Sequence, residues 1–152
     1  QFGTLFRADP ESASRRLYPP NAFPEMREAA FWLRERIKPN ERVAVLGSEP
    51  QIFFYARCRS STPYLYMYPL LEPQPYAVEM QKDLMERLKH SPPRYLVHVQ
   101  IPTSWLIYRN SKTELMEWLP EFLQQSYVRE REIPIGEKSV RREIVVYRRR
   151  EM

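Results

Sequence analysis

A short apolar run that ends in a glycine, followed at once by a helix-start signature, most constrains what this chain can fold into. Val43–Leu46 is entirely apolar and stops at Gly47, and residues 48–51 read Ser-Glu-Pro-Gln. A serine followed three residues later by glutamine is a capping-box pattern, so Ser48 is expected to cap a helix over about 49–56. A strand therefore feeds a helix through a tight turn.

Alternation after this helix predicts a second strand, parallel to the first. Over residues 62–68 three tyrosines alternate with a leucine and a methionine, which is the period of a strand. Pro69 then ends the pairing, because proline has no backbone N–H to donate.

Helical spacing of apolar residues predicts three longer helices. The first covers about 23–38, between Pro24 and Pro39, and the second covers 77–89. The third starts with a capping box from Ser111 to Glu114. Its buried stripe is Leu115, Trp118, Leu119, Phe122 and Leu123, and Pro120 interrupts it with a kink expected near Trp118.

The remaining strands follow from period-two patterns. Residues 95–101 form a third strand, with Leu96, His98 and Gln100 on one face, where His98 is expected to be a satisfied core histidine. Two β-rich runs, 127–135 and 143–147, are separated by a charged loop and predict an antiparallel pair.

This order of elements predicts an α/β fold: a three-layer, Rossmann-like sandwich with a mostly parallel sheet and a C-terminal antiparallel hairpin. We expect a connecting arm over residues 1–20, which holds Pro10, Pro19 and Pro20 without a sustained period, with Leu17 and Tyr18 as its anchors. Residues 21–152 are expected to form a single domain.

The charge pattern limits the partners. The net charge is +5, and most charges are interleaved as on a solvated surface. The exception is a group placed on the hairpin end that suits anionic lipid head groups or polyphosphate: Lys138, Arg141, Arg142 and Arg148–Arg150. No nucleic acid is expected as a partner, because no recognition-helix or aromatic RNA-binding motif accompanies the charge.

Other classes are disfavoured by residues that the chain lacks. One cysteine, Cys58, and two histidines make a metal centre improbable, and Cys58 is expected to be a plain buried or half-buried thiol. No apolar run has the roughly 18 residues of a membrane span, and no signal peptide is evident. Because the chain opens at Gln1 without Met, we expect it to be part of something longer.

Candidate site residues lie after the predicted strands, where open parallel sheets bind ligands. Five residues are expected to form one concave patch that meets a glycan: Glu49, Tyr68, Glu72, Gln74 and Trp105. Alternatively, Glu72 and Gln74 hold a proline-rich loop against the sheet. A dinucleotide cofactor is not expected, because Gly47 stands alone and Glu49 places a carboxylate where an anion would bind.

Catalytic readings of the same rim are weaker. Glu49 and Glu72 are a candidate acid/base pair, although capping a helix or pairing with Arg57 or Arg59 explains them as well. Ser104 has no accompanying base, so a serine nucleophile is unsupported. No cofactor is predicted.

Three phrases resemble a known protein family: residues 45–55 (VLGSEPQIFFY), 66–76 (YMYPLLEPQPY) and 102–105 (PTSW). They are similar to the soluble domain that follows the last membrane span of bacterial dolichyl-phosphate-mannose protein mannosyltransferase-like, multi-spanning glycosyltransferases. The resemblance covers about residues 21–135. It implies a lipid-phosphate-sugar donor, transfer on the outer face of the inner membrane, and catalytic acidic residues in a loop of the membrane part.

No catalytic residue of that family can be placed on this chain. The expected function is therefore that of a periplasmic accessory domain that recognises or positions an acceptor or glycan, without chemistry of its own. Its expected partners are the membrane-embedded part of the same polypeptide and a glycan or lipid-linked sugar. The alternatives are an independent, small-molecule-binding Rossmann-like enzyme and a protein-interaction module.

Overall fold

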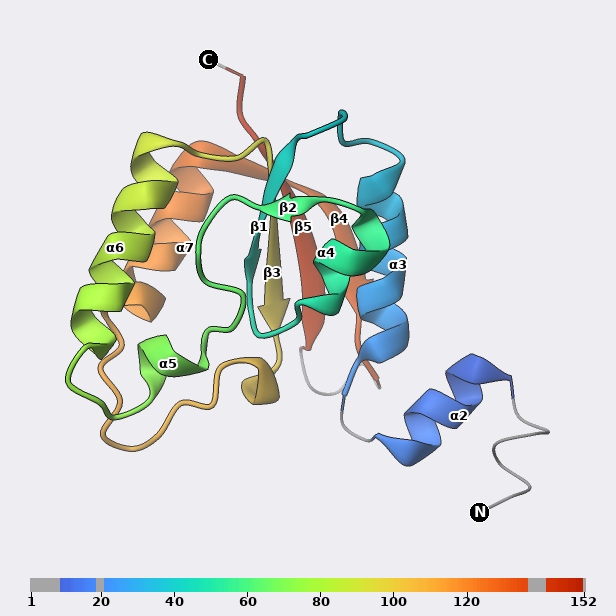
Figure 1. The fold of residues 1–152 in the computed structure, drawn as a ribbon, viewed down its shortest axis with the longest axis horizontal. Helices are drawn as coiled ribbons and strands as arrows, with labels where there is room; N and C mark the ends of the chain where they lie inside the picture. The colour runs from blue at the N-terminus through green and yellow to red at the C-terminus, as the bar shows by residue number, and fades with distance from the viewer. Residues whose placement is uncertain (1–8, 19–20, 137–141, 152) are drawn as a thin grey trace.

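A computed structural model, which describes residues 9–18, 21–136 and 142–151, shows a mixed α/β fold built on one five-stranded sheet (Figure 1). The strands are β1 (Arg42–Leu46), β2 (Arg59–Ser60), β3 (Tyr95–Gln100), β4 (Tyr127–Pro134) and β5 (Glu143–Arg149), in the spatial order β2-β1-β3-β5-β4. β1 pairs in parallel with β2 and β3, whereas β5 pairs antiparallel with β3 and β4. The sheet is therefore mixed.

Six α-helices and one 3₁₀ turn are found in the described residues. They are α2 (Pro10–Leu17), α3 (Phe23–Arg34), α4 (Gln51–Ala56), α5 (Tyr68–Leu71), α6 (Ala77–His90), α7 (Glu114–Ser126) and η1 (Pro102–Ser104). The three longer predicted helices correspond to α3, α6 and α7, although α3 ends at Arg34. The predicted kink of α7 stays a prediction.

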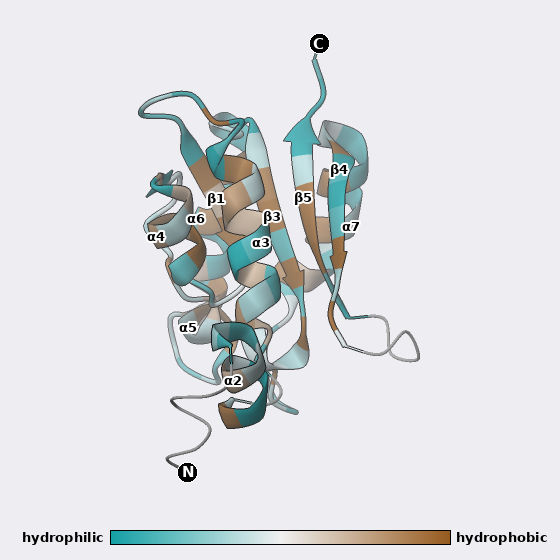
Figure 2. Cartoon of the chain, turned by 90° about the vertical axis from the view of Figure 1, so that its right-hand side faces the viewer, coloured by the Kyte–Doolittle hydropathy of each residue, from teal (hydrophilic) through white to brown (hydrophobic). Residues whose placement is uncertain are grey.

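Helices pack against both faces of the sheet. Side chains alternate along β3, so that Val97 and Val99 join the core formed with α3 and α4, whereas Leu96 joins the core formed with α5, α6 and α7. Figure 2 shows the apolar residues concentrated along β1, β3 and β5, the strands that these helices cover. The expected division of faces along residues 95–101 is confirmed.

The second strand was wrongly predicted in place and length. The parallel neighbour of β1 is β2, only two residues long, and the chain leaves the sheet after the backbone N–H of Ser61 donates to the carbonyl of Val43 at 2.9 Å. Residues 62–67 form no strand, and Tyr68 begins α5, with Pro69 in its first turn. Two prolines flank the tyrosine alternation and restrict its backbone, so the period did not reflect pairing.

Both predicted helix caps are wrong. α4 begins at Gln51, and the hydroxyl of Ser48 instead accepts a hydrogen bond from the backbone N–H of Met67 at 2.9 Å. α7 begins at Glu114 without a side-chain cap from its own N-terminus. Its Leu115 N–H donates to the side chain of Gln81 on α6 at 2.8 Å, so a residue distant in sequence does the work of a cap.

The predicted arm contains a helix. Asp9 caps α2 by accepting hydrogen bonds from two backbone N–H groups, and Pro10 occupies the first turn. None of the residues of α2 is buried, and Leu17 and Tyr18 are exposed, but the Tyr18 ring meets the Phe23 ring of α3 edge to face with centroids 5.7 Å apart. Arg15 also holds the helix, through a 2.6 Å ion pair with the buried Glu25 of α3.

The basic residues of the C-terminal part do not gather at one end. Arg142 precedes β5, whereas Arg148, Arg149 and Arg150 lie at its far end, a strand length away. The prediction of one charged hairpin end is therefore wrong for the arginines that the structure describes. Lys138 and Arg141 lie outside the described residues.

Candidate functional site

The carboxyl ends of β1 and β3 lie side by side, because these strands are parallel neighbours in the sheet. Gly47, Ser48 and Glu49 follow β1, and η1 follows β3. Ligands of open α/β sheets bind outside the carboxyl ends of parallel strands. This edge is therefore the natural location for a functional site.

Glu49 is buried at this edge, with only 4% of it exposed. Its Oε1 accepts a hydrogen bond from the hydroxyl of the fully buried Ser104, and its Oε2 has no well-formed hydrogen bond to the described residues. Burial raises the pKa of Glu49 to about 7, although the Ser104 hydroxyl and the backbone N–H of Ser48 oppose the rise. Glu49 thus joins the end of β1 to η1 and titrates near neutral pH.

A glycine at position 47 makes room for this carboxylate. The φ angle of Gly47 is +156°, and a Cβ added there would lie 2.2 Å from Oε2 of Glu49 and 2.9 Å from Cβ of Val99. Both distances are shorter than the contacts that a Cβ makes with non-bonded atoms in folded proteins. Gly47, which follows β1 directly, therefore has a packing role.

The start of α5 is tied to both strand ends. Ser48 accepts the hydrogen bond from Met67, and the Tyr68 hydroxyl donates to the backbone carbonyl of Thr103 at 3.0 Å. The pKa of Tyr68 is raised, mainly by burial and further by the charge of Glu49. Three segments far apart in sequence are thus held together at one edge.

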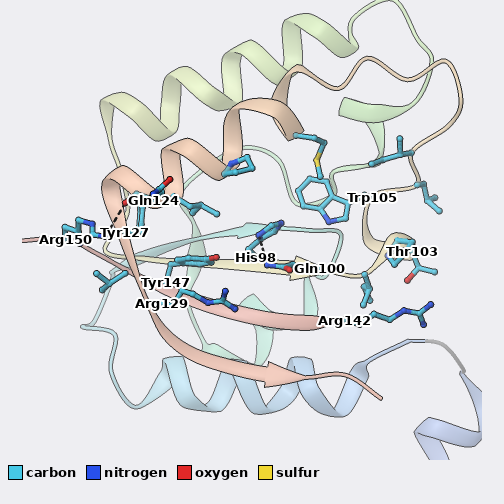
Figure 3. A pocket seen from close by; sticks show the side chains of 18 residues that line it. His98, Gln100, Thr103, Trp105, Gln124, Tyr127, Arg129, Arg142, Tyr147 and Arg150 are labelled. Atoms are coloured by element: carbon cyan, nitrogen blue, oxygen red, sulfur yellow. Dashed lines mark hydrogen bonds between the residues drawn. The ribbon is translucent and has the colours of Figure 1, made fainter. Parts of the chain in front are cut away.

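An open cavity of about 1280 Å³ lies next to η1, on the face of the sheet that carries α7 (Figure 3). Strands β3, β4 and β5 form its floor, α7 forms one wall, and residues 101–107 close one end. Small-molecule sites typically enclose about 300–1,000 Å³, so this volume is ample for a sugar-sized ligand.

The cavity combines apolar surface with a few polar groups. Its apolar side chains include Trp105, Met116, Leu123, Tyr127 and Tyr147, together with Ile101, Leu106 and Ile107 at one end. The uncharged polar side chains are His98, Gln100, Thr103 and Gln124. Such a mixture is typical of sites in which aromatic rings stack on a ligand and a few polar groups orient it.

His98 and Trp105 form the inner corner of the cavity. Their rings meet edge to face with centroids 5.8 Å apart, and the Trp105 indole N–H donates to the carbonyl of Val99 at 2.8 Å. Burial, and secondarily the charge of Arg129, lowers the pKa of His98 to about 4. His98 is therefore neutral at neutral pH, and one of its ring nitrogens lies 3.4 Å from the side-chain nitrogen of Gln100.

Three arginines and no acidic residue are among the described residues that line the cavity. Arg129 is already paired, at 2.6 Å from a carboxylate oxygen of Glu132 and 2.7 Å from one of Glu143. Arg150 donates to the backbone carbonyl of Gln124 at 3.2 Å. The third, Arg142, lies at the opposite end from Arg150 (Figure 3).

The five predicted site residues, Glu49, Tyr68, Glu72, Gln74 and Trp105, lie at different positions relative to the cavity. Of the five, Trp105 alone lines the cavity. Glu49 and Tyr68 contact η1 through their hydrogen bonds to residues 104 and 103. Gln74 donates to the carbonyl of Pro69 at 2.7 Å, which is the contact expected of a residue that holds its own loop, and Glu72 is half-buried in that loop. Ligand binding by these residues stays a prediction.

Sequence reasoning did not select the cavity residues of α7, β4 and β5. One signal was available in the sequence, because His98 and Gln100 are polar residues on one face of an otherwise apolar strand. Polar side chains on a central strand indicate that helices leave that part of the face uncovered.

Other site types find no support in the part of the chain that the structure describes. Groups of three or more potential metal ligands are absent there. Cys58 is half-buried, as expected, and burial raises the pKa of its thiol to about 11, which disfavours the reactive thiolate. None of the described helices has the length and apolarity to cross a bilayer.

Comparison of the chain with protein-family models, with curated proteins and with solved structures finds no match.

Proposed function

We propose that this chain is a non-catalytic, ligand-recognition domain of an inner-membrane glycosyltransferase of the dolichyl-phosphate-mannose protein mannosyltransferase type, located on the periplasmic side. The three sequence phrases that resemble this family support the context. In this proposal the mixed α/β fold is a Rossmann-like, three-layer sandwich with a C-terminal hairpin. The domain works together with the membrane-embedded part of the same polypeptide.

The cavity beside η1 is the observation on which the proposed ligand rests. A glycan or the sugar of a lipid-linked donor contacts Trp105 at the inner corner of the cavity and hydrogen-bonds to Gln100 and Gln124, which line the same cavity. A pyranose suits such a site, since its C–H groups can meet the apolar lining and its hydroxyls can meet the amides.

No carboxylate is among the described residues that line the cavity, which favours recognition over acid/base chemistry. Glu49, whose pKa of about 7 would suit a general acid or base, is buried and does not line the cavity. The second candidate, an independent Rossmann-like enzyme, would need Glu49 to meet a substrate. A rearrangement of η1 would be required, because Ser104 occupies one oxygen of the carboxylate.

Binding can be measured through the tryptophan indole resonances of the ¹⁵N-labelled chain, titrated with a panel of mannosides, oligosaccharides and short-chain polyprenyl phosphate sugars. We expect the Trp105 indole signal to shift saturably with at least one member. The Trp32 signal serves as an internal control, because Trp32 packs against the core on the other face of the sheet.

A matched pair of variants locates the site. Gln124→Trp places a large side chain in the cavity and should abolish the shift, whereas Gln125→Trp, at the next exposed position of α7 and outside the cavity lining, should not. If no ligand shifts Trp105, or if both variants bind alike, the cavity is not a sugar site. Binding of a nucleotide or dinucleotide instead would favour the enzyme.

A further inference from the structure

Three consecutive large apolar residues are exposed next to the cavity. Leu106, Ile107 and Tyr108 are 39%, 51% and 49% exposed, although they follow the almost fully buried Trp105 directly. Leu106 has a φ angle of +47°, in the left-handed region that branched side chains rarely adopt. Backbone strain of this kind persists only where the surrounding structure imposes it.

Hydrogen bonds hold this segment in place. The backbone N–H of Leu106 donates to the carbonyl of Pro102 at 3.1 Å, and that of Tyr108 donates to the hydroxyl of Ser111 at 2.8 Å. The same hydroxyl donates to the carbonyl of Leu71, at the end of α5. The apolar side chains are therefore presented to solvent by an anchored loop.

The charged residues of this segment are all basic. Arg109 and Lys112 are exposed, and residues 99–113 contain no aspartate or glutamate, whereas Glu114, which follows, lies 3.9 Å from Lys82 of α6. We call residues 106–112 the apolar-basic loop. Figure 1 shows it along the lower edge, between the end of β3 and the start of α7, whereas the C-terminus leaves from the opposite edge.

We propose that the apolar-basic loop docks on a lipid bilayer that carries anionic head groups. Ile107 and Tyr108 enter the interfacial region, where tyrosine is favoured because its ring is apolar and its hydroxyl polar. Arg109 and Lys112 lie over the lipid phosphates, because anionic leaflets attract basic residues near the surface. A loop with contiguous apolar residues, adjacent cations and no acid complements such a surface better than it complements a protein of mixed charge.

The variants that test this inference leave the proposed sugar site unchanged. Leu106 and Ile107 line the cavity, but docking requires only lipid, and Tyr108, Arg109 and Lys112 do not line it. A chain that binds sugar without binding vesicles, or vesicles without sugar, would therefore separate the two proposals.

The experiment is flotation of the chain with vesicles of phosphatidylcholine, with and without about one quarter phosphatidylglycerol. We expect partitioning onto the anionic vesicles that weakens as salt is added, because exposed charges are screened. Tyr108→Asp should lower the partition coefficient at least about fivefold, since it removes apolar area and adds a charge that anionic lipid repels. Phe54→Asp is the matched control, because Phe54 is 76% exposed on α4, on the other face of the sheet.

A second pair tests the charges. Arg109→Gln/Lys112→Gln and Arg149→Gln/Arg150→Gln remove the same net charge, from the apolar-basic loop and from the C-terminal end of β5. We expect only the first pair to lower the partition coefficient, by at least about threefold. Circular dichroism confirms that each variant is folded.

The proposal is overturned if the chain does not bind anionic vesicles, or if Phe54→Asp or the C-terminal pair weakens binding as much as the loop variants do. Sedimentation velocity tests the main alternative occupant, a second copy of this chain. A dimer that is lost in Tyr108→Asp, combined with unchanged vesicle binding by that variant, would show a protein interface instead.

Discussion

Replacing Glu49 by glutamine should change how the stability of the protein depends on pH. The buried carboxyl has a pKa of about 7 in the folded protein, against 4.5 for an ordinary glutamate, because burial disfavours its charge. Glutamine keeps the shape of the side chain and remains neutral at every pH. It therefore imitates the protonated form of Glu49, including acceptance of the hydrogen bond from Ser104.

The sign follows from the protons bound in each state. Between the unfolded and folded pKa values the folded protein holds a proton that the unfolded chain has lost, so the free energy of unfolding falls as pH rises. The stabilising contribution is fully present below the unfolded pKa of 4.5 and is lost as pH rises through about 7. The rise of the Glu49 pKa from 4.5 to about 7 corresponds to about 3 kcal/mol in the free energy of unfolding.

Urea unfolding gives the free energy of unfolding of Glu49→Gln and of the unaltered chain at each pH from about 4.5 to about 8.5. The difference between the two values then reports the effect of Glu49 alone. Over this range we expect the free energy of unfolding of the variant to rise by about 3 kcal/mol relative to that of the unaltered chain. The other titrating groups are the same in both proteins, so their contributions cancel in the difference. Glu79→Gln, on the exposed surface of α6, is the control and should give a constant difference. The side-chain ¹³C resonance of Glu49, identified by its loss in the variant, should titrate near pH 7.

The reasoning would be refuted by a pH-independent difference for Glu49→Gln. A variant that instead becomes less stable than the unaltered chain as pH rises would mean that the ionised carboxylate is the stabilising form. Glu49 would then have an unseen partner for its second oxygen, and its pKa would be lowered.

Three further predictions concern the same edge of the sheet and are measured by urea denaturation. Gly47→Ala should cost about 3 kcal/mol, because a new Cβ meets the carboxylate of Glu49, whereas Gly136→Ala, with nothing within 4 Å of its Cβ, should cost only about 1 kcal/mol for its positive φ; equal costs would exclude the packing role. Gln81→Ala should cost at least about 3 kcal/mol, because the buried amide satisfies three backbone groups, and a cost below about 1 kcal/mol would contradict this. Ser48→Ala should cost about 1–3 kcal/mol by leaving a buried backbone N–H without its acceptor, and an unchanged midpoint would contradict that hydrogen bond.

The elements that sequence predicted well are those whose signal is local and repeated. α6 follows the spacing of Leu84 and Leu88, and the prolines after His90 end it. β1 and β3 are short, apolar and bounded by residues that stop a strand, so their positions were predicted within a residue. Such patterns depend on burial of one face, which the chain itself encodes.

The errors arose where partners are distant in sequence. The capping boxes at Ser48 and Ser111 met every local criterion. Nevertheless, the Ser48 hydroxyl accepts a hydrogen bond from the backbone N–H of Met67, and the Ser111 hydroxyl donates to the backbone carbonyl of Leu71. A local pattern states which groups are available for hydrogen bonding. It does not state which buried donor or acceptor lies closer in the folded chain, and Gln81 shows how such a partner replaces a cap.

The candidate site was predicted in part for the same reason. The rule that ligands meet the carboxyl ends of parallel strands identified the ends of β1 and β3, where Trp105 lies beside the cavity. The rest of the cavity depends on the strand order, because β5 pairs with β3 and brings Tyr147 to the floor, and β4 pairs with β5 and brings Arg129 beside it. No local pattern contains the information that β5 inserts between β3 and β4.

The phrase Gly-Ser-Glu-Pro-Gln acquires a coherent role from these contacts. Gly47 leaves space for the carboxylate of Glu49, which accepts from Ser104, and the Tyr68 hydroxyl holds the carbonyl of Thr103. Residues 103 and 105 line the cavity on either side of the clamped Ser104. Glu49 and Tyr68, selected as ligand-binding residues, therefore act on the cavity through η1: they fix the turn whose next residue supplies the indole ring. A side chain buried for this purpose need not touch a ligand to affect its binding, because displacement of η1 would displace Trp105 as well.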